Sequence, residues 1–331
     1  MTRRSRRAAT SVANATRLVL LVLLVLLVSA CGSARRAMPV QRSPSPRAEL
    51  PGGPPAHIAV IVMENEEYGD IVGAPTTPFI TGLARRYALA TRMYAVSHPS
   101  LPNYLALTGG STFGISSDCT DCSVTGTGLG DQLERKRVPW KAYMENLPHP
   151  CFTGAGAGDY AKKHDPFVYY YQDRAHNPAG CSHVVPLTQL AADERAGTLP
   201  SFLWITPNLC HDMHDCDPAT GDRFLAGLVP PLLRAMDGSG AAPPGQTRGG
   251  PASLLFITWD EGSTDDGCCR LASGGHVATI LAGSGARRGA RLSTPVDHYS
   301  VLQATEDLLG LPRMRGAACP CTPSLAPLLA R

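Results

Sequence analysis

The sequence lacks an excess of charge of either sign. Its 331 residues include 30 Lys and Arg against 27 Asp and Glu, which leaves a formal net charge of +3. Proteins that bind nucleic acid through its phosphates carry a marked basic patch or a basic excess. The composition therefore gives no indication of a nucleic-acid partner, and we expect none.

Long apolar runs are also scarce. The one clear run, Leu18–Val28, is too short to span a membrane comfortably, and it follows the basic segment MTRRSRR, as in a signal peptide. The run ends in LVSAC, which resembles a bacterial lipobox with Cys31 as the lipidated first residue. We predict a lipoprotein signal peptide at residues 1–30 and an exported protein that faces the extracytoplasmic side, held at the cell membrane by lipid on Cys31. A plain secreted protein is the alternative.

The segment after the lipobox has no periodic apolar face. Residues 31–55 are rich in Pro, Arg and Ser, and we expect a flexible tether. Residues 56–331 then form one domain that is long enough for a single sizeable core.

A second CxxC at zinc spacing is absent as well. Cys119 and Cys122 form the one such pair, so a structural disulfide is the better interpretation than a zinc site. Of 11 cysteines, ten remain when Cys31 is set aside, an even number that suits an oxidising compartment. Cys210 and Cys216 are close enough in sequence to form a candidate pair.

The secondary-structure pattern alternates between short strands and helices. Short apolar runs of this length are typical of strands buried on both faces. The alternation predicts a three-layer α/β/α sandwich with a mostly parallel central sheet. The runs are residues 57–63, 202–206, 254–259 and 277–282, and the helical patterns are residues 78–90, 101–107, 222–236 and 300–309.

Details of two regions follow from the same pattern. Asp222 is a candidate N-cap for the third helix, which Pro230 and Pro231 should break or kink. Residues 111–200 are poorly periodic, and we expect them to cap or decorate the sheet.

Polar residues gather directly after the expected strands. In open α/β sheets, ligands bind outside the carboxyl ends of the strands, so residues far apart in sequence can converge there. Taken singly, each could instead cap a turn or fill a core position, but several strand ends share the pattern. The residues are Glu64 and Asn65, then His211, Asp212 and His214, then Asp260 and Glu261, with His276 just before the last strand.

Oxygen donors dominate this set and indicate a divalent cation. Carboxylate and amide oxygens suit hard cations such as Mg²⁺, Ca²⁺ or Mn²⁺, whereas the histidines could shift the choice. The expected ligands are Glu64, Asn65, Asp260 and Glu261.

The stretch SHPSLPNYLALTGG, residues 97–110, holds a candidate nucleophile. Ser100 is well placed to be the N-cap of the helix that follows, and this explains Ser100 without any catalysis. It does not explain His98 or Asn103. A hydroxyl at a helix N-terminus would also lie where negative charge is stabilised, beside the expected cation.

Together the motifs IVMENEEY, SHPSLPNYLALTGG, TPNLCHDMHDCDPATGD, TWDEG and DHYSVLQATEDLLGL resemble the bacterial phosphoesterase family of acid phosphatases and phospholipases C, a distant branch of the alkaline phosphatase superfamily. The resemblance runs from about His57 to near the C-terminus and fits the acid phosphatase branch better. It implies that Ser100 is the nucleophile and that Asn103 holds the phosphate. The same resemblance makes Glu64, Asn65, Asp260 and Glu261 metal ligands, with His98, His211, Asp212, His214 and His276 around the phosphate.

The sequence thus predicts a metal-dependent acid phosphatase that hydrolyses phosphate monoesters through a phosphoserine on Ser100. The alternatives are a phospholipase C-type phosphodiesterase, a phosphatase of phosphoinositide headgroups and, in a different class, a non-catalytic surface lipoprotein. A sulfatase-like function is disfavoured, because Ser100 does not stand in a C/S-x-P-x-R setting.

Overall fold

The computed structural model describes residues 46–50, 52–171, 180–238, 251–269 and 272–331. These residues fall within one compact unit, Ser43–Arg331. The expected signal peptide, Cys31 and residues 31–45 of the expected tether lie outside the described residues.

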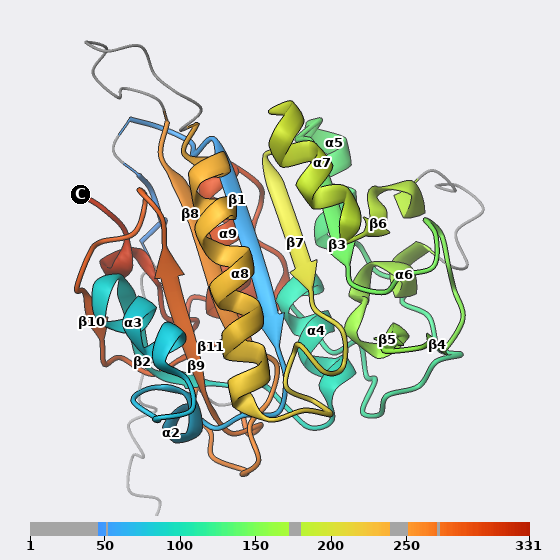
Figure 1. Cartoon of the computed structure of the whole chain (residues 1–331), viewed down its shortest axis with the longest axis horizontal. Helices are drawn as coiled ribbons and strands as arrows, with labels where there is room; N and C mark the ends of the chain where they lie inside the picture. The colour runs from blue at the N-terminus through green and yellow to red at the C-terminus, as the bar shows by residue number, and fades with distance from the viewer. Residues whose placement is uncertain (1–45, 51, 172–179, 239–250, 270–271) are drawn as a thin grey trace, which may run out of the picture. The chain divides into compact units, whose positions relative to one another are not determined.

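A mixed, mostly parallel sheet forms the centre of this unit (Figure 1). It has nine strands in the order β10-β2-β9-β8-β1-β7-β3-β6, with β11 paired to β2. Strand β1 pairs in parallel with β7 and β8, whereas β9 runs antiparallel to β8 and β2. The strands are β1 His57–Met63, β2 Ala88–Tyr94, β3 Trp140–Met144, β6 Val184–Pro186, β7 Phe202–Thr206, β8 Ser253–Trp259, β9 His276–Ala282, β10 Arg291–Leu292 and β11 Val296–Asp297, and a separate small sheet joins β4 Gly156–Ala157 to β5 Tyr160–Ala161.

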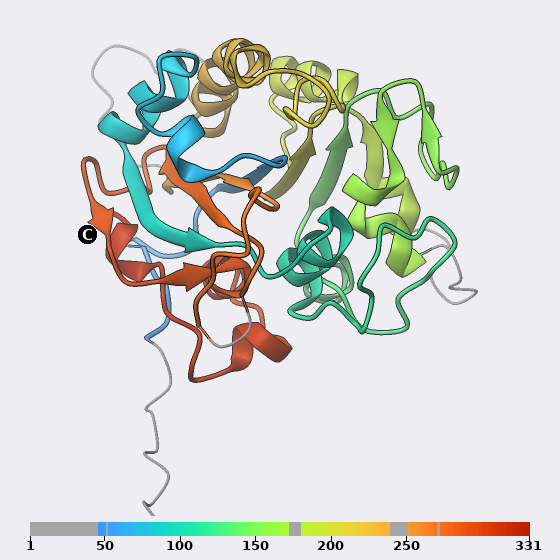
Figure 2. The same ribbon diagram turned by 90° about the horizontal axis from the view of Figure 1, so that it is seen from below.

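Helices cover both faces of the sheet, which confirms the three-layer α/β/α prediction (Figure 2). One layer contains α3 and α8, which pack against each other, and the opposite layer contains α4 and α9, which also pack together. The helices are α2 Tyr68–Ile71, α3 Pro78–Arg86, α4 Ser100–Gly109, α5 Leu129–Lys136, α6 Pro166–Tyr171, α7 Thr188–Ala196, α8 Pro218–Met236, α9 His298–Leu308 and α10 Arg315–Ala318, with short 3₁₀ turns η1 Lys162–His164, η2 Gly180–His183 and η3 Ala326–Leu328.

The central strands are buried on both faces, as their continuous apolar sequences predict. Every residue of β7 and β8 is buried, and in β1 only His57 is partly exposed. Trp204 and Trp259 are among the largest fully buried side chains. Burying a large apolar side chain contributes about 1.5–3 kcal/mol, so these strands form a rigid base for the loops at their ends.

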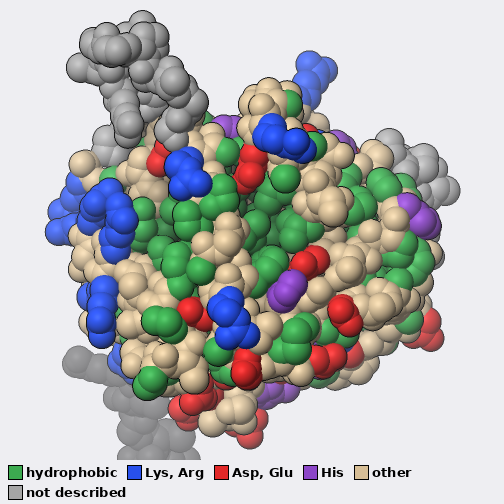
Figure 3. All heavy atoms as spheres, viewed as in Figure 1, with side chains coloured by type: hydrophobic (Ala, Val, Ile, Leu, Met, Phe, Trp, Pro, Cys, Tyr) green, Lys and Arg blue, Asp and Glu red, His purple; other side chains and the backbone are tan. Residues whose placement is uncertain are grey.

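The α3–α8 layer carries a shallow groove on its outer surface. Its volume is about 580 Å³, and Phe79, Leu83 and Val229 supply apolar lining. Arg86 and Arg288 lie over the ring of Tyr87 at 5.3 and 5.7 Å from its centroid. Figure 3 shows this face of the molecule, with apolar side chains between basic ones.

The start of α8 differs from the prediction. The helix begins at Pro218 and is capped by Asp217, whose side chain accepts a hydrogen bond from the Thr220 backbone N–H. Asp222 lies inside the helix and instead accepts backbone N–H bonds from Phe79 at 3.2 Å and Ile80 at 2.8 Å. It therefore caps α3 across the layer, a contact that one helical pattern cannot reveal.

Two further expectations need correction. Pro230 and Pro231 do not break α8, which is helical from residue 218 to 236. Residues 111–200 do more than decorate the sheet, because β3 and β6 lie inside this region and extend the main sheet beyond β7.

The last part of the expected tether packs onto the domain. Ala48 and Leu50 are 1% and 7% exposed, and the Ala48 backbone N–H donates to Asp307 Oδ2 at 2.8 Å. Arg313 also binds this oxygen, at 2.7 Å. Within residues 31–55, the described part is thus anchored near α9.

Ten cysteines pair in the structure, which joins Cys210 to Cys216 as the sequence suggests and closes the CxxC as a disulfide. The pairs are Cys119–Cys122, Cys151–Cys181, Cys210–Cys216, Cys268–Cys269 and Cys319–Cys321.

Within the described ranges, no helix has both the length and the apolar character needed to cross a membrane.

The hydrogen bonds from α3 to Asp222 predict that Asp222 contributes more to stability than Asp217. Asp222→Ala should lower the free energy of unfolding by about 1–3 kcal/mol, because it leaves two buried N–H groups of α3 without an acceptor. Asp217→Ala, at an exposed position, should cost less. Urea unfolding followed by circular dichroism measures both, and an equal loss would contradict the proposed importance of the Asp222 contact.

Candidate active site

The carboxyl ends of β1, β7 and β8 meet at one edge of the sheet. Glu64 directly follows β1, Asp260 directly follows β8, and Asp212 lies on the loop after β7. Backbone hydrogen bonds tie these ends together, from Glu64 N–H to the Asp212 carbonyl and from Asp260 N–H to the Met63 carbonyl, each at 2.9 Å. The convergence that the strand-end pattern predicts is therefore present.

Glu64 is the centre of this cluster and is fully buried. Its carboxylate accepts hydrogen bonds from Ser100 Oγ at 3.1 Å and from the Tyr104 hydroxyl, and His164 Nε2 lies 3.2 Å away. Burial alone would raise the pKa of Glu64, but the charge and hydrogen bond of His164, with the Tyr104 bond, hold it below its ordinary value. Glu64 is thus the most readily ionised carboxylate of the cluster.

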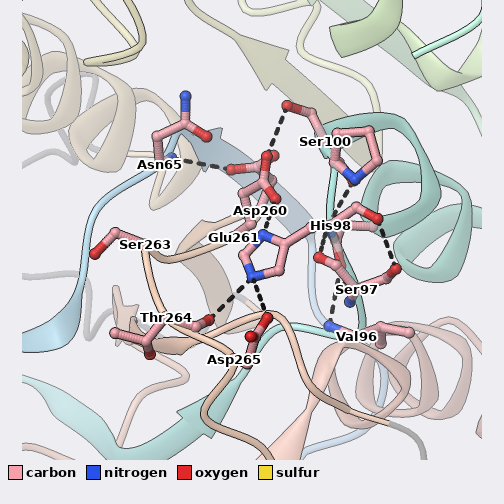
Figure 4. Close-up of polar contacts among 12 residues, drawn as sticks. Asn65, Val96, Ser97, His98, Ser100, Asp260, Glu261, Ser263, Thr264 and Asp265 are labelled. Atoms are coloured by element: carbon pink, nitrogen blue, oxygen red, sulfur yellow. Dashed lines mark hydrogen bonds and ion pairs between the residues drawn. The ribbon is translucent and has the colours of Figure 1, made fainter. Parts of the chain in front are cut away.

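Ser100 is not the N-cap of α4. Pro99 occupies the cap position without a capping side-chain bond of its own, and Ser100 is the first residue of the helix. The hydroxyl instead lies 3.1 Å from Glu64 Oε2. It also lies 3.2 Å from Glu261 Oε1 (Figure 4). A serine hydroxyl held between two carboxylates has acceptors for its proton, as a nucleophile requires.

Glu261 links Ser100 to His98. Its other carboxylate oxygen contacts His98 Nδ1, while His98 Nε2 lies 2.9 Å from the Thr264 carbonyl (Figure 4). Burial and the nearby charge of Glu64 raise the pKa of Glu261, although His98 opposes them. Burial lowers the pKa of His98, but the Thr264 carbonyl and Glu261 outweigh it and raise the value.

Asp260 is fully buried and incompletely paired. Its Oδ1 accepts the backbone N–H of Asn65 at 3.1 Å, whereas its Oδ2 has no hydrogen-bond partner among the described residues. Burial, followed by the charges of Glu64 and Glu261, raises the pKa of Asp260 well above its ordinary value. A free carboxylate at this position is costly unless a cation lies beside it.

His164 is the site residue that sequence reasoning missed. It belongs to η1, is 2% exposed, and lies between two carboxylates, with Nε2 3.2 Å from Glu64 and Nδ1 3.1 Å from Asp212 Oδ2. Burial lowers the pKa of His164, but Glu64 and Asp212 raise it to about 9. His164 does not follow a core strand, so the strand-end rule could not find it.

Three residues form a candidate metal site. Glu64, His164 and Asp212 each offer a ligand atom, and these atoms lie within 4.8 Å of one another. Beside them, the buried Asp260 Oδ2 has no hydrogen-bond partner in the described structure, whereas His164 contacts Glu64 and Asp212 as ion-pair partners at 3.2 and 3.1 Å. A buried carboxylate oxygen is rarely left unpaired, so this cluster fits a bound divalent cation. Mixed nitrogen and oxygen donors leave the identity of the cation open.

This set differs from the predicted ligands. Asp260 and Glu261 lie around Glu64 as expected, but Asn65 contributes its backbone N–H to Asp260, and its side chain makes no hydrogen bond within the described ranges. Asn65 has a positive φ of 59°, which Asn tolerates well, and this turns the chain sharply after β1.

Asn103 holds the loop that carries His98 and Ser100. Its Oδ1 accepts the backbone N–H groups of Val96 at 2.9 Å and Ser97 at 3.0 Å, and its Nδ2 donates to the carbonyls of Ser97 at 2.7 Å and Pro99 at 3.2 Å. Both amide N–H groups are thus engaged by the backbone. The geometry does not support the expected role of Asn103 in binding phosphate.

The remaining histidines are not gathered around Ser100. His211 pairs with Glu145 at 2.9 Å and stacks on Phe224, and His276 contacts the Thr91 carbonyl at 3.0 Å and stacks on Tyr68. His214 lies closer, with its ring centroid 5.5 Å from that of His164. The expectation that all of these histidines surround one phosphate therefore has no support in this geometry.

Known proteins resemble the chain over most of its length. Residues 72–312 match the model of the Phosphoesterase family. A phosphatidylinositol-3-phosphatase of Mycobacterium tuberculosis is 34% identical over 261 residues, which cover 78% of each chain. An acid phosphatase of Aspergillus fumigatus is 29% identical over 263 residues, 76% of this chain but only 54% of its own length. The chain thus spans about half of that fungal relative.

Solved structures show the same fold at low sequence identity. A protein of the alkaline phosphatase superfamily from Vibrio parahaemolyticus superposes with a TM-score of 0.55 at 12% identity, over 83% of this chain and 72% of that chain. The PsFucS1 sulfatase of Pseudoalteromonas sp. gives a TM-score of 0.52 at 14% identity, over 84% and 72%. These likenesses establish the fold and nothing finer.

The candidate metal site predicts cation binding, which can be measured without turnover. After chelation, titration with Mn²⁺ or Zn²⁺ in a calorimeter should show binding, and the bound cation should raise the melting temperature. His164→Ala should weaken the affinity by at least about tenfold, since it removes a candidate ligand. His211→Ala, which alters the pair with Glu145, is the matched control, and equal affinities for both variants would contradict the site.

Proposed function

The chain belongs to the Phosphoesterase family and is a phosphoric ester hydrolase, and from this premise we propose that it is a metal-dependent phosphomonoesterase with Ser100 as its nucleophile. The observation that carries the proposal is the position of the Ser100 hydroxyl, between Glu64 and Glu261 at the first residue of α4. A helix N-terminus favours the negative charge of a phosphoryl group.

The candidate ligands for the cation are Glu64, His164 and Asp212, with Asp260 beside them. When bound, a divalent cation would supply positive charge that offsets the buried carboxylates, favours the ionised serine hydroxyl and polarises the phosphate. The close approach of the ligand atoms of Glu64, His164 and Asp212 and the unpaired Oδ2 of Asp260 support this assignment.

The reaction proceeds in two displacements. Ser100 Oγ attacks phosphorus and loses its proton to Glu261, whose raised pKa makes it the better acceptor of the two carboxylates that contact the hydroxyl. The ester P–O bond breaks, and the leaving alcohol takes up that proton from Glu261. Water then attacks the phosphorus of the phosphoserine and the Ser100 Oγ–P bond breaks; one proton of the water passes to Ser100 Oγ, and inorganic phosphate is released.

His98 and Asn103 serve this step in different ways. His98 contacts Glu261, the proposed proton acceptor, and its side chain is 34% exposed. His98 therefore connects Glu261 to solvent. Asn103 fixes the backbone from Val96 to Pro99 and so positions Ser100. His211 and His276 have no part in the proposed chemistry, because their partners are Glu145 and the Thr91 carbonyl.

The proposed location is extracytoplasmic, with residues 56–331 as one catalytic domain tethered through a lipid on Cys31. Five disulfides in the structure suit an oxidising compartment. The similarity to a phosphatidylinositol-3-phosphatase favours a monophosphate on a lipid headgroup as a candidate substrate, beside small soluble monoesters.

Removal of the hydroxyl tests the nucleophile. Ser100→Ala should lower the turnover of p-nitrophenyl phosphate by at least about a thousandfold, because no phosphoserine can form. Ser263→Ala, an exposed serine on the neighbouring loop, should keep the wild-type rate. Acid quenching during turnover, followed by peptide mass spectrometry, should find a phosphoryl group on Ser100.

A folded Ser100→Ala variant with wild-type turnover would overturn the assignment. Faster hydrolysis of bis(p-nitrophenyl) phosphate than of the monoester would instead favour a phosphodiesterase of phospholipase C type. Phosphate release from phosphatidylinositol 3-phosphate in vesicles tests the lipid substrate.

A further inference from the structure

Lys163 precedes His164 on η1 and is a cation that the sequence patterns do not indicate. Its ammonium lies 3.0 Å from Asp118 Oδ2 and 3.0 Å from His214 Nε2, and its side chain is 21% exposed. A partly exposed ammonium can meet a ligand, unlike the buried groups of the cluster.

Two short series of contacts connect Lys163 to the segment that carries Ser100. The other carboxylate oxygen of Asp118 accepts the backbone N–H of Leu101 at 2.9 Å, so one carboxylate joins Lys163 to the residue after the nucleophile. On the other side, His164 contacts the same Glu64 carboxylate that accepts the Ser100 hydroxyl. Lys163 therefore flanks the N-terminus of α4.

His214 holds the ammonium without neutralising it. Its Nδ1 lies 2.6 Å from Asp215 Oδ1, so Nδ1–H donates to that carboxylate and Nε2 accepts from Lys163. An ammonium has three donors, and the described structure uses two of them, for Asp118 and His214. The third is available to an incoming oxygen.

A disulfide-closed turn fixes the position of this lysine. Lys162 donates to the Thr120 carbonyl at 2.6 Å, and Lys163 binds Asp118 at the start of the same turn, which the Cys119–Cys122 disulfide closes. Two consecutive lysines are thus tied to one short segment, and contacts within the protein hold the Lys163 ammonium in place.

The charge around Ser100 explains why a cation is needed there. Glu64 and Glu261 contact the Ser100 hydroxyl, and carboxylate charge at these positions repels a phosphate dianion. A monoester carries three non-bridging oxygens and up to two charges, whereas a diester has two such oxygens and one charge. An ammonium beside the nucleophile therefore favours the monoester.

We propose that Lys163 binds a non-bridging phosphate oxygen of the substrate and thereby selects phosphate monoesters over diesters. The proposal rests on the proposed function of the Ser100 site and adds to it the residue that determines the ester class. It also assigns His214 and Asp118 as positioning residues for the ammonium.

Lys163→Gln tests the proposal because it removes the charge and keeps most of the length. It should lower kcat/KM for p-nitrophenyl phosphate by about tenfold to a hundredfold, the loss typical of a hydrogen bond to a charged group. It should change kcat/KM for bis(p-nitrophenyl) phosphate by less than about threefold, on the same scale. Lys163→Arg should recover part of the monoester rate, and Lys136→Gln, at an exposed position on α5, should behave as wild type.

Binding of inorganic phosphate gives a second readout that needs no turnover. Calorimetry should show weaker phosphate binding by Lys163→Gln than by the wild type, and unchanged binding by Lys136→Gln. Equal losses of kcat/KM for the monoester and the diester, together with an unchanged phosphate affinity, would show that Lys163 only stabilises the local structure. This result would overturn the proposal. If the wild type hydrolyses neither ester, the proposed function fails, and phosphate affinity alone then decides the role of Lys163.

Discussion

The burial of four carboxylates at one edge of the sheet is the constraint on which the rest of the site depends. Glu64, Asp212, Asp260 and Glu261 are all less than 9% exposed. Burial and mutual repulsion raise the pKa of Asp212, Asp260 and Glu261, whereas His164 holds that of Glu64 below its ordinary value. So much buried acid is stable only when protons or cations offset it, and this requirement is the physical basis of the proposed cation dependence.

The parallel sheet explains why the acids converge. Strand β1 lies between β7 and β8, and the register pairs Met63 with Trp259, so the next residues, Glu64 and Asp260, leave the sheet side by side. The Asp260 N–H bond to the Met63 carbonyl closes this pair, and that from Glu64 to Asp212 adds the loop after β7. Ser100, the candidate nucleophile, is then brought to this edge by α4, whose entry loop Asn103 holds through four hydrogen bonds.

How well each part of the structure can be predicted from the sequence depends on whether neighbouring or distant residues fix it. The sequence predicts strands β1 and β7 with their observed bounds, because a buried strand consists of consecutive apolar residues. The strand-end rule likewise brings Glu64, Asp212 and Asp260 together. Local rules fail where a partner is distant in sequence: Asp222 resembles a cap for its own helix but caps α3, and Ser100 resembles a cap but binds Glu64 and Glu261. His164 was missed for the same reason, since its partners lie on two strand ends and its own segment has no periodicity.

The two signs of charge at the site therefore come from different parts of the chain. The central strands supply the acids, whereas His164 and Lys163 come from η1, which lies in the connection between β3 and β6. The turn that binds both lysines, residues 118–122, lies outside the sheet as well. Because the acids and Ser100 are fixed by strand register and by α4, the candidate nucleophile and the carboxylate ligands of the candidate cation site belong to the fold itself. His164 and Lys163 instead depend on a connection held by side-chain contacts and one disulfide. A change in that connection could thus alter which phosphate ester is preferred while the nucleophile stays in place.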